Sequence, residues 1–78
     1  MPRNDLIAML ERRPFQPFRL TTTDNEVVEV RQPGMMLIAG NDITVGVPDP
    51  HSPPPVASRL LWLGFENIAH VEPIEMVQ

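Results

Sequence analysis

The stretch FRLTTTDNEVVEVR, residues 18–31, predicts a β-hairpin and decides the fold. Apolar and polar residues alternate in both of its halves, which is the pattern of a strand with one buried face. With Phe18, Leu20, Val28 and Val30 on the core face, Leu20 must pair with Val28. Phe18 must then pair with Val30. The register of the hairpin therefore follows from the alternation alone.

The same register predicts the hairpin's loop. Residues 23–25 remain unpaired, and Asn25 tolerates the left-handed conformation that a three-residue loop needs at its end. A two-residue turn would instead pair Leu20 with Glu29 and bury the carboxylate. In the preferred register Arg19 faces Glu29 on the outer side of the sheet.

Upstream of the hairpin, residues 4–13 or thereabouts are predicted to form a helix. Asn4 or Asp5 could cap its N-terminus, and the proline after it ends it. Arg12 and Arg13 fall in its last turn, where cations suit the helix dipole. Such a short helix is not stable alone, so its apolar stripe must dock on the rest of the chain. The stripe consists of Leu6, Ile7, Met9 and Leu10.

Downstream, further short strands are predicted between turn-forming residues. Gly40-Asn41-Asp42 is a tight hairpin turn, residues 48–57 are a proline-rich loop, and residues 64–67 are a short bend or 3₁₀ turn. The strands are expected at residues 35–39, 43–47, 59–63 and 68–72. One face is expected to carry Met36, Ile38, Ile43, Val45 and Val47. The chain is thus predicted to be a single, mainly β domain, with the helix followed by a five- or six-stranded antiparallel barrel over residues 18–73.

Two of these strands, residues 35–38 and 60–63, are apolar on both faces. Such runs indicate burial on both sides, and the helix can cover only one patch. Curvature of the barrel and the proline loop could cover the rest. We favour cover by another copy of the chain. The candidate residues of that oligomer interface are Met35, Leu37, Leu60 and Trp62.

The charge distribution argues against nucleic acid as a partner. The net charge is −4. Residues 1–20 carry four arginines against two carboxylates, whereas residues 21–78 carry two arginines against eight. An acidic body is a poor match to a phosphate backbone. No segment approaches the roughly 20 apolar residues that span a bilayer, and a chain without cysteine fits a reducing compartment. We expect a cytoplasmic protein with no membrane partner.

No arrangement of residues suggests catalysis. His51 lies near Asp49, and His70 near Glu72, so each pair could supply two metal ligands where a site generally needs three or four. The sequence also lacks a glycine-rich phosphate loop. We expect no enzyme activity, no metal and no cofactor.

Two segments could either bind a partner or serve only the structure of the domain. Residues 50–53 fit the P-x-x-P pattern of a ligand for aromatic grooves, although the loop is more simply a stiff connector. The basic end of the chain could offer cations and a stacking surface to single-stranded RNA, although Phe15 more simply seals the helix against the barrel. The residues that would contact RNA are Arg12, Arg13, Phe15 and Arg19.

The stretch RRPFQPFRL at residues 12–20, together with IAHVEP at residues 68–73, resembles a family of short uncharacterised bacterial proteins. In that family a helix leads through a P-F-x-P-F-R segment into a small β domain. The resemblance covers most of the chain and implies the fold, while no established function comes with it.

A more distant similarity is to Sm-like proteins, whose small SH3-like barrels follow an N-terminal helix, join edge to edge and bind RNA. The sequence LWLG at residues 61–64, followed by Ile68 and Val71, resembles their second motif. Leu63 stands where that motif has a cation, and one extra residue separates Gly64 from Ile68. The resemblance therefore implies the topology and edge-to-edge assembly, but its RNA-binding positions are missing. We expect a non-catalytic, self-associating module, with an Sm-like RNA-binding regulator as the alternative.

Overall fold

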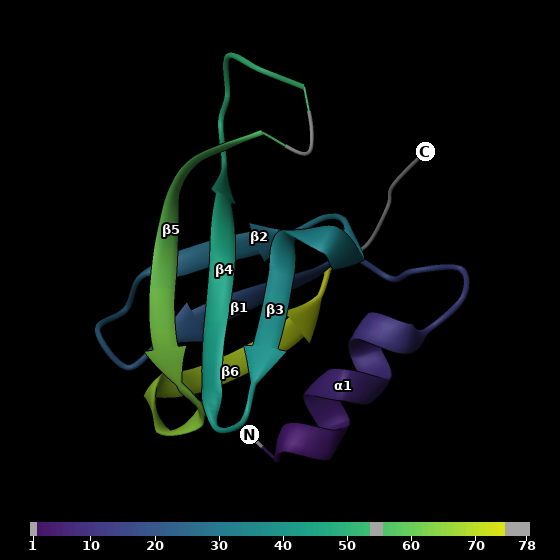
Figure 1. Cartoon of the computed structure of the whole chain (residues 1–78), viewed down its shortest axis with the longest axis vertical. Helices are drawn as coiled ribbons and strands as arrows, with labels where there is room; N and C mark the ends of the chain where they lie inside the picture. The colour runs from purple at the N-terminus through teal and green to yellow at the C-terminus, as the bar shows by residue number, and fades with distance from the viewer. Residues whose placement is uncertain (1, 54–55, 75–78) are drawn as a thin grey trace.

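A computed structural model of the chain describes residues 2–53 and 56–74. Within them, one short helix precedes six strands and two 3₁₀ turns (Figure 1). The elements are α1 (Arg3–Glu11), β1 (Phe18–Thr22), β2 (Val27–Val30), η1 (Pro33–Met35), β3 (Met36–Ala39), β4 (Asp42–Pro48), β5 (Ala57–Gly64), η2 (Phe65–Asn67) and β6 (Ile68–Pro73).

The predicted hairpin is confirmed in its register and its loop. Phe18 pairs with Val30 and Leu20 with Val28. The Thr22 amide donates to the Glu26 carbonyl, which closes the three-residue loop. Asn25 takes the left-handed conformation, with φ 66°. Strict alternation with one buried face is what made the register predictable.

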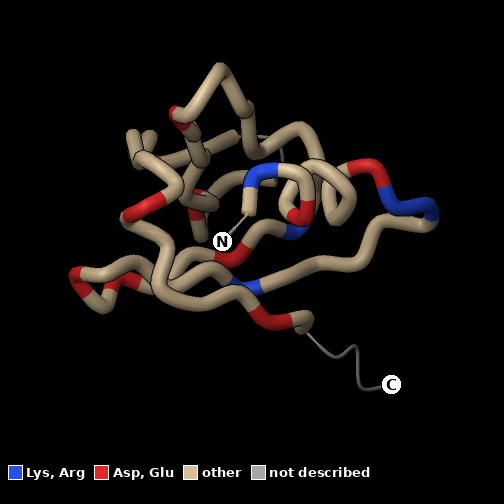
Figure 2. Tube along the Cα trace, turned by 90° about the horizontal axis from the view of Figure 1, so that it is seen from below, with Lys and Arg blue, Asp and Glu red and all other residues tan. Residues whose placement is uncertain are grey.

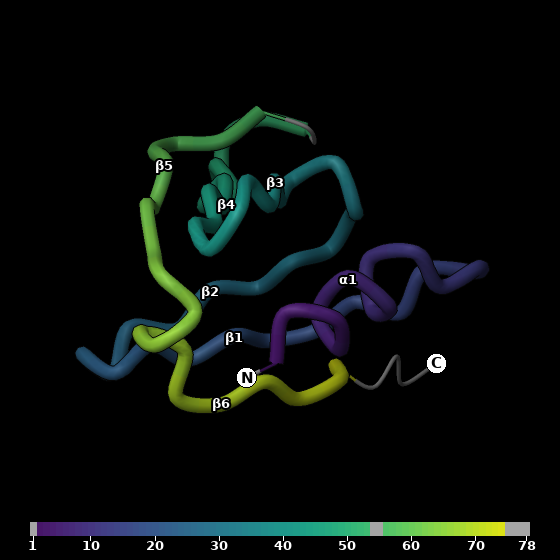
Figure 3. The backbone as a smooth tube through the Cα atoms, turned by 60° about the horizontal axis from the view of Figure 1, so that its bottom comes forward, coloured from purple at the N-terminus to yellow at the C-terminus, as the bar shows by residue number. Residues whose placement is uncertain are grey.

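The strands form two three-stranded antiparallel sheets, ordered β2-β1-β6 and β3-β4-β5 (Figures 1 and 3). Figure 3 shows them as two layers, connected by the chain between β2 and β3 and between β5 and β6. The mainly β prediction is therefore confirmed. A closed barrel is not what the described residues form, because strand pairing does not continue from one sheet into the other. Between β2 and β3, the strand is interrupted by η1, where Pro33 lacks the amide hydrogen that strand pairing would need.

The core lies between the two layers. It holds Phe18 and Leu20 of the central strand β1, both fully buried, and inward residues of β4. The predicted common face of β3 and β4 is confirmed, since Met36 pairs with Val45 and Ile38 with Ile43. The buried apolar cluster comprises Leu6, Phe18, Leu20, Val28, Val30, Met36, Ile43, Val45 and Ile68.

The helix is anchored as expected, but its ends differ from the prediction. Leu6 is fully buried, and the predicted cap at Asn4 or Asp5 is wrong because both lie inside the helix, which starts after Pro2. Arg12 and Arg13 lie beyond its last residue rather than in its last turn. Arg13 instead donates from Nη1 to the Leu10 carbonyl at 3.1 Å and satisfies a carbonyl that the helix end leaves open.

The second sheet departs from the prediction mainly at its boundaries. Met35 ends the turn η1 rather than beginning β3. The β3–β4 turn has two residues, and Gly40, with φ 62°, takes the left-handed first position where type II′ turns carry glycine. The proline-rich loop is shorter than predicted because β4 runs through Pro48 and β5 begins at Ala57. Its residues 54–55 lie outside the described residues.

The hairpin loop gives a direct test of the backbone. We expect Asn25→Ala to destabilise the protein by about 1 kcal/mol, because a Cβ without a side-chain hydrogen bond disfavours the left-handed region. Asn25→Gly should stay within about 0.5 kcal/mol of the native chain, because glycine adopts this conformation readily. Urea unfolding of both variants measures the difference. Equal stabilities of the two would contradict the assignment.

Candidate interaction surface

The outer side of the sheet β3-β4-β5 carries the largest exposed apolar residues of the described chain. Leu37, Thr44 and Trp62 lie side by side across the three strands, since Thr44 pairs with both of its neighbours. Leu37 is 71% exposed and Trp62 73%. Leu60, one step further along β5, is 55% exposed. We call Leu37, Leu60 and Trp62 the apolar face. In Figure 1 the sheet β3-β4-β5 lies in front of the sheet β2-β1-β6.

A shallow hollow of about 130 Å³ adjoins the apolar face. Gly46 of β4, which pairs with Leu60, is one of its lining residues, and the Met35 side chain packs closely over this glycine. A Cβ at this glycine would lie 3.1 Å from Met35 Cε and 3.2 Å from Ala57 Cβ. The hollow is lined by Gly34, Met35, Met36, Leu37, Thr44, Gly46, Ala57 and Leu60.

Three of the four residues predicted for an interface thus share one exposed surface, and the fourth does not. Met35 is buried. It was placed on a strand because it continues an apolar run, but the turn η1 that begins at Pro33 includes it, and its Cε packs against Gly46 of β4. Its side chain contributes to the wall of the hollow instead.

Charge is nearly absent from this side of the sheet. Strand alternation places Asp42 on the same side as Thr44, at the β3–β4 turn. Arg59, which pairs with Val47, is on the opposite side and forms an ion pair with Glu26, the residue before β2. In Figure 2 the acidic positions are scattered along the trace, and the cationic ones lie among them. The centre of the apolar face can therefore meet another surface without burying a charge.

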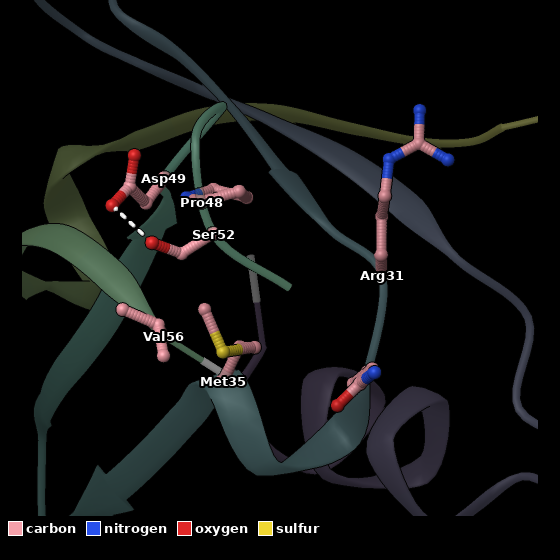
Figure 4. Close-up of a pocket in the computed structure, with 7 residues that line it drawn as sticks. Arg31, Met35, Pro48, Asp49, Ser52 and Val56 are labelled. Carbon is pink, nitrogen blue, oxygen red and sulfur yellow. Dashed lines mark hydrogen bonds between the residues drawn. The ribbon is translucent and has the colours of Figure 1, made fainter. Parts of the chain in front are cut away.

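A second cavity, of about 120 Å³, lies where β2 gives way to η1 and the proline-rich loop folds over it (Figure 4). Met35, Pro48 and Val56 form its apolar wall. Figure 4 shows the guanidinium of Arg31 pointing away from Met35 and Val56; it bonds Glu29 at 2.8 Å and 3.1 Å. The guanidinium of Arg31 is therefore engaged within the fold and not turned towards the cavity.

Asp49 holds the proline-rich loop in shape. Its carboxylate accepts hydrogen bonds from the His51 amide and from Ser52 Oγ, each at 2.9 Å. This Asx-type turn favours the connector interpretation of the loop. Pro50 and Pro53 are exposed on it, so the P-x-x-P ligand reading stays a hypothesis.

The outer side of the other sheet carries a chain of ion pairs. Arg19 contacts Glu29 at 3.4 Å, as the hairpin register predicts, and Glu72 at 3.3 Å. Hydrogen bonds from Arg31, assisted by its charge and by Arg19, hold the pKa of the Glu29 carboxyl below its ordinary value. His70 lies 3.7 Å from Glu72 on the same face. Within the described part of the chain, no three metal-ligating side chains converge.

The residues predicted for RNA contact do not form one surface. Arg12 and Arg13 are exposed after the helix. Phe15 packs against the core, with its ring 6.0 Å from that of Phe18 and tilted by 58°. Arg19 is engaged by two carboxylates. A stacking platform next to free cations, which single-stranded RNA requires, is therefore not assembled from these four side chains.

Comparisons of the chain with protein-family models, curated proteins and solved structures found no match. No helix within residues 2–53 and 56–74 combines the length and the apolar character needed to cross a membrane. The apolar face and its hollow are thus the features on which a function can be argued.

The hollow was not anticipated from the sequence, and its only signal was Gly46 inside a strand. An isolated glycine in a strand marks a bulge or a place where another group comes close. The exposure of Val27 on β2, at 52%, was likewise not anticipated. Val27 lies between the hairpin loop and the alternating residues, so the alternation did not assign it to a face.

Glu29 generates a prediction for the pH dependence of stability. Its pKa is lowered in the folded chain, so its stabilisation is present above the ordinary glutamate pKa of 4.5 and is lost as the pH falls through the lowered folded value. We expect Glu29→Gln to lower the free energy of unfolding at pH 7 by less than about 1 kcal/mol, since the pair is exposed. The difference should shrink towards pH 3 in urea titrations.

The matched control is Glu66→Gln, which removes an exposed carboxylate on η2. Glu66 takes part in none of the ion pairs found among the described residues, so this variant should not show the loss of stability that removing an ion-paired carboxylate causes at pH 7. A Glu29→Gln deficit that is constant or grows towards low pH would contradict the assignment.

Proposed function

We propose that the protein is a non-catalytic interaction module that self-associates through the apolar face. The observation that carries the proposal is the exposure of Leu37, Leu60 and Trp62 together on one side of one sheet. Single exposed apolar residues are common, but adjacent ones that form a patch mark an interaction surface. The role follows from that surface: to bring copies of the chain together in an assembly.

The surface is chemically suited to a partner of the same kind. Trp62 can remove on the order of 150 Å² from water, which is worth roughly 4 kcal/mol per copy. The cost of association is roughly 4–15 kcal/mol. The burial of two tryptophans therefore does little more than offset this cost. Leu37 and Leu60 add about 2 kcal/mol each. The expected complex is therefore weak, in the micromolar range.

We place the fold of this module close to the small SH3-like barrels. The observations in favour are the pairing of the last strand with the first and the 3₁₀ turn before it. In this reading β2 and β3 correspond to one bent strand that η1 interrupts. Contact through a sheet face takes the place of the edge-to-edge contact that the sequence suggested. We do not extend the proposal to RNA, because Arg19 is already paired with carboxylates.

Light scattering of the native chain tests the proposal. At about 100 μM, where weak interfaces are populated, we expect a mass above that of the monomer. Leu37→Arg should return the protein to monomer, because two copies would bury like charges. Trp62, the only tryptophan, should also emit at longer wavelength in this variant, because its indole then stays in water.

The matched control is Val27→Arg, which places the same charge at a half-exposed apolar residue of the other sheet. It should leave the mass unchanged. Circular dichroism should show that both variants remain folded, because neither residue is buried. A native chain that stays monomeric at this concentration would contradict the proposal.

A further inference from the structure

One end of the sheet β3-β4-β5 brings an indole and a carboxylate onto the same side. Asp42 begins β4 at the β3–β4 turn and pairs with Gly64, the last residue of β5. Trp62 lies two residues before Gly64, so strand alternation places it on the same side of the sheet as Asp42. In Figure 1 the β3–β4 turn and η2 lie at this same end of the sheet.

Glu66 adds a second carboxylate, although it belongs to η2. A Cβ on Gly64 would lie 2.6 Å from Glu66 Cδ, so the Glu66 carboxylate occupies the space that a side chain at Gly64 would take. The backbone of Gly64 is extended, with φ −89° and ψ 163°, and it therefore continues the alternation of β5. The Glu66 carboxylate thus lies on the side of the sheet that carries Trp62 and Asp42.

A shallow cavity of about 270 Å³ lies beside these groups. Asp42, Trp62 and Gly64 are among the residues that line it. Diagonal neighbours on antiparallel strands, as Trp62 and Asp42 are here, lie roughly 7–8 Å apart, which is within reach of an aromatic side chain. A flat cationic group in the cavity can therefore contact the indole and a carboxylate at the same time.

The two carboxylates are not used by the fold. None of the ion pairs found within residues 2–53 and 56–74 includes Asp42 or Glu66. Arg3 of α1 reaches the β3–β4 turn, but its Nε donates to the Gly40 carbonyl at 2.9 Å. The cavity is thus bordered by negative charge and by an indole that is 73% exposed.

We propose that this cavity binds the guanidinium group of an arginine on a partner protein, stacked on Trp62 and paired with Asp42 and Glu66. Tryptophan is the aromatic side chain that attracts a cation over its ring most strongly. A planar guanidinium can stack on the indole while its N–H groups donate to carboxylates, which the compact ammonium of lysine does less well. The net charge of −4 also attracts a cationic partner.

The emission of Trp62, the only tryptophan, reports on this site directly. The probe is a blocked Gly-Arg-Gly peptide, added to the protein at about 1 μM, where self-association in the micromolar range leaves mostly monomer. We expect a saturable change in emission with a Kd in the millimolar range, because all the contacts are exposed. Gly-Lys-Gly should bind more weakly, and the peptide with uncharged citrulline in place of arginine should give no saturable change.

Variants separate a site from general attraction to an acidic protein. Asp42→Asn and Glu66→Gln should each raise the Kd about two- to fivefold, as expected for the loss of one exposed ion pair. The matched control is Asp24→Asn, which makes the same change of charge at an exposed residue of the hairpin loop and should leave the Kd unchanged. Circular dichroism should show that all three variants remain folded, because the three carboxylates are exposed.

The site does not depend on self-association, so the two proposals fail separately. No saturable response of the native chain to the arginine peptide would overturn the site and leave self-association standing. An equal response to the citrulline peptide, or an equal rise of the Kd in all three variants, would also overturn it. An equal Kd for the lysine and arginine peptides would contradict the stacking of a guanidinium on Trp62.

Discussion

The pairing of β1 with strands on both of its sides is the constraint on which the rest of the structure depends. Phe18 and Leu20 are fully buried because β2 and β6 flank them in the sheet and β3-β4-β5 covers them. Leu6 of α1 joins the same cluster. Without a cysteine to cross-link the chain, a domain of this size depends on that single core. The Arg59–Glu26 ion pair is a further link between the sheets, at their periphery.

The outer sides of the two sheets divide charge and apolar surface between them. On β2-β1-β6 the arginines and glutamates compensate one another, which leaves a polar surface that water solvates well. On β3-β4-β5 the equivalent positions are mostly apolar or small, and Asp42 lies at the end of the sheet, at the β3–β4 turn. Because of this division, burial away from water is favourable only for the outer side of β3-β4-β5. In the proposed contact the molecule would therefore face its partner with this side, although the chain carries a net charge of −4.

Patterns that depend on neighbouring residues were predicted from the sequence, and those that depend on distant ones were not. The hairpin register followed from parity, because shifting it by one residue would bury Glu29. The exposure of Leu37, Leu60 and Trp62 followed from strands that are apolar on both faces. The separation into two sheets did not, since apolarity does not reveal that η1 interrupts the ladder at Pro33. The hollow was also missed, because residues of four elements, η1, β3, β4 and β5, line it.

The position of β6 has a consequence for how the chain folds. Arg19 meets Glu72 across 53 residues of sequence, whereas every pairing of the second sheet joins strands that follow one another. Contacts between distant residues form late, because the intervening chain must first be ordered. During synthesis, the second edge of β1 would thus stay open until β6 emerges, while β3-β4-β5 can already assemble. In that interval β1 is the segment most exposed to mispairing with other chains.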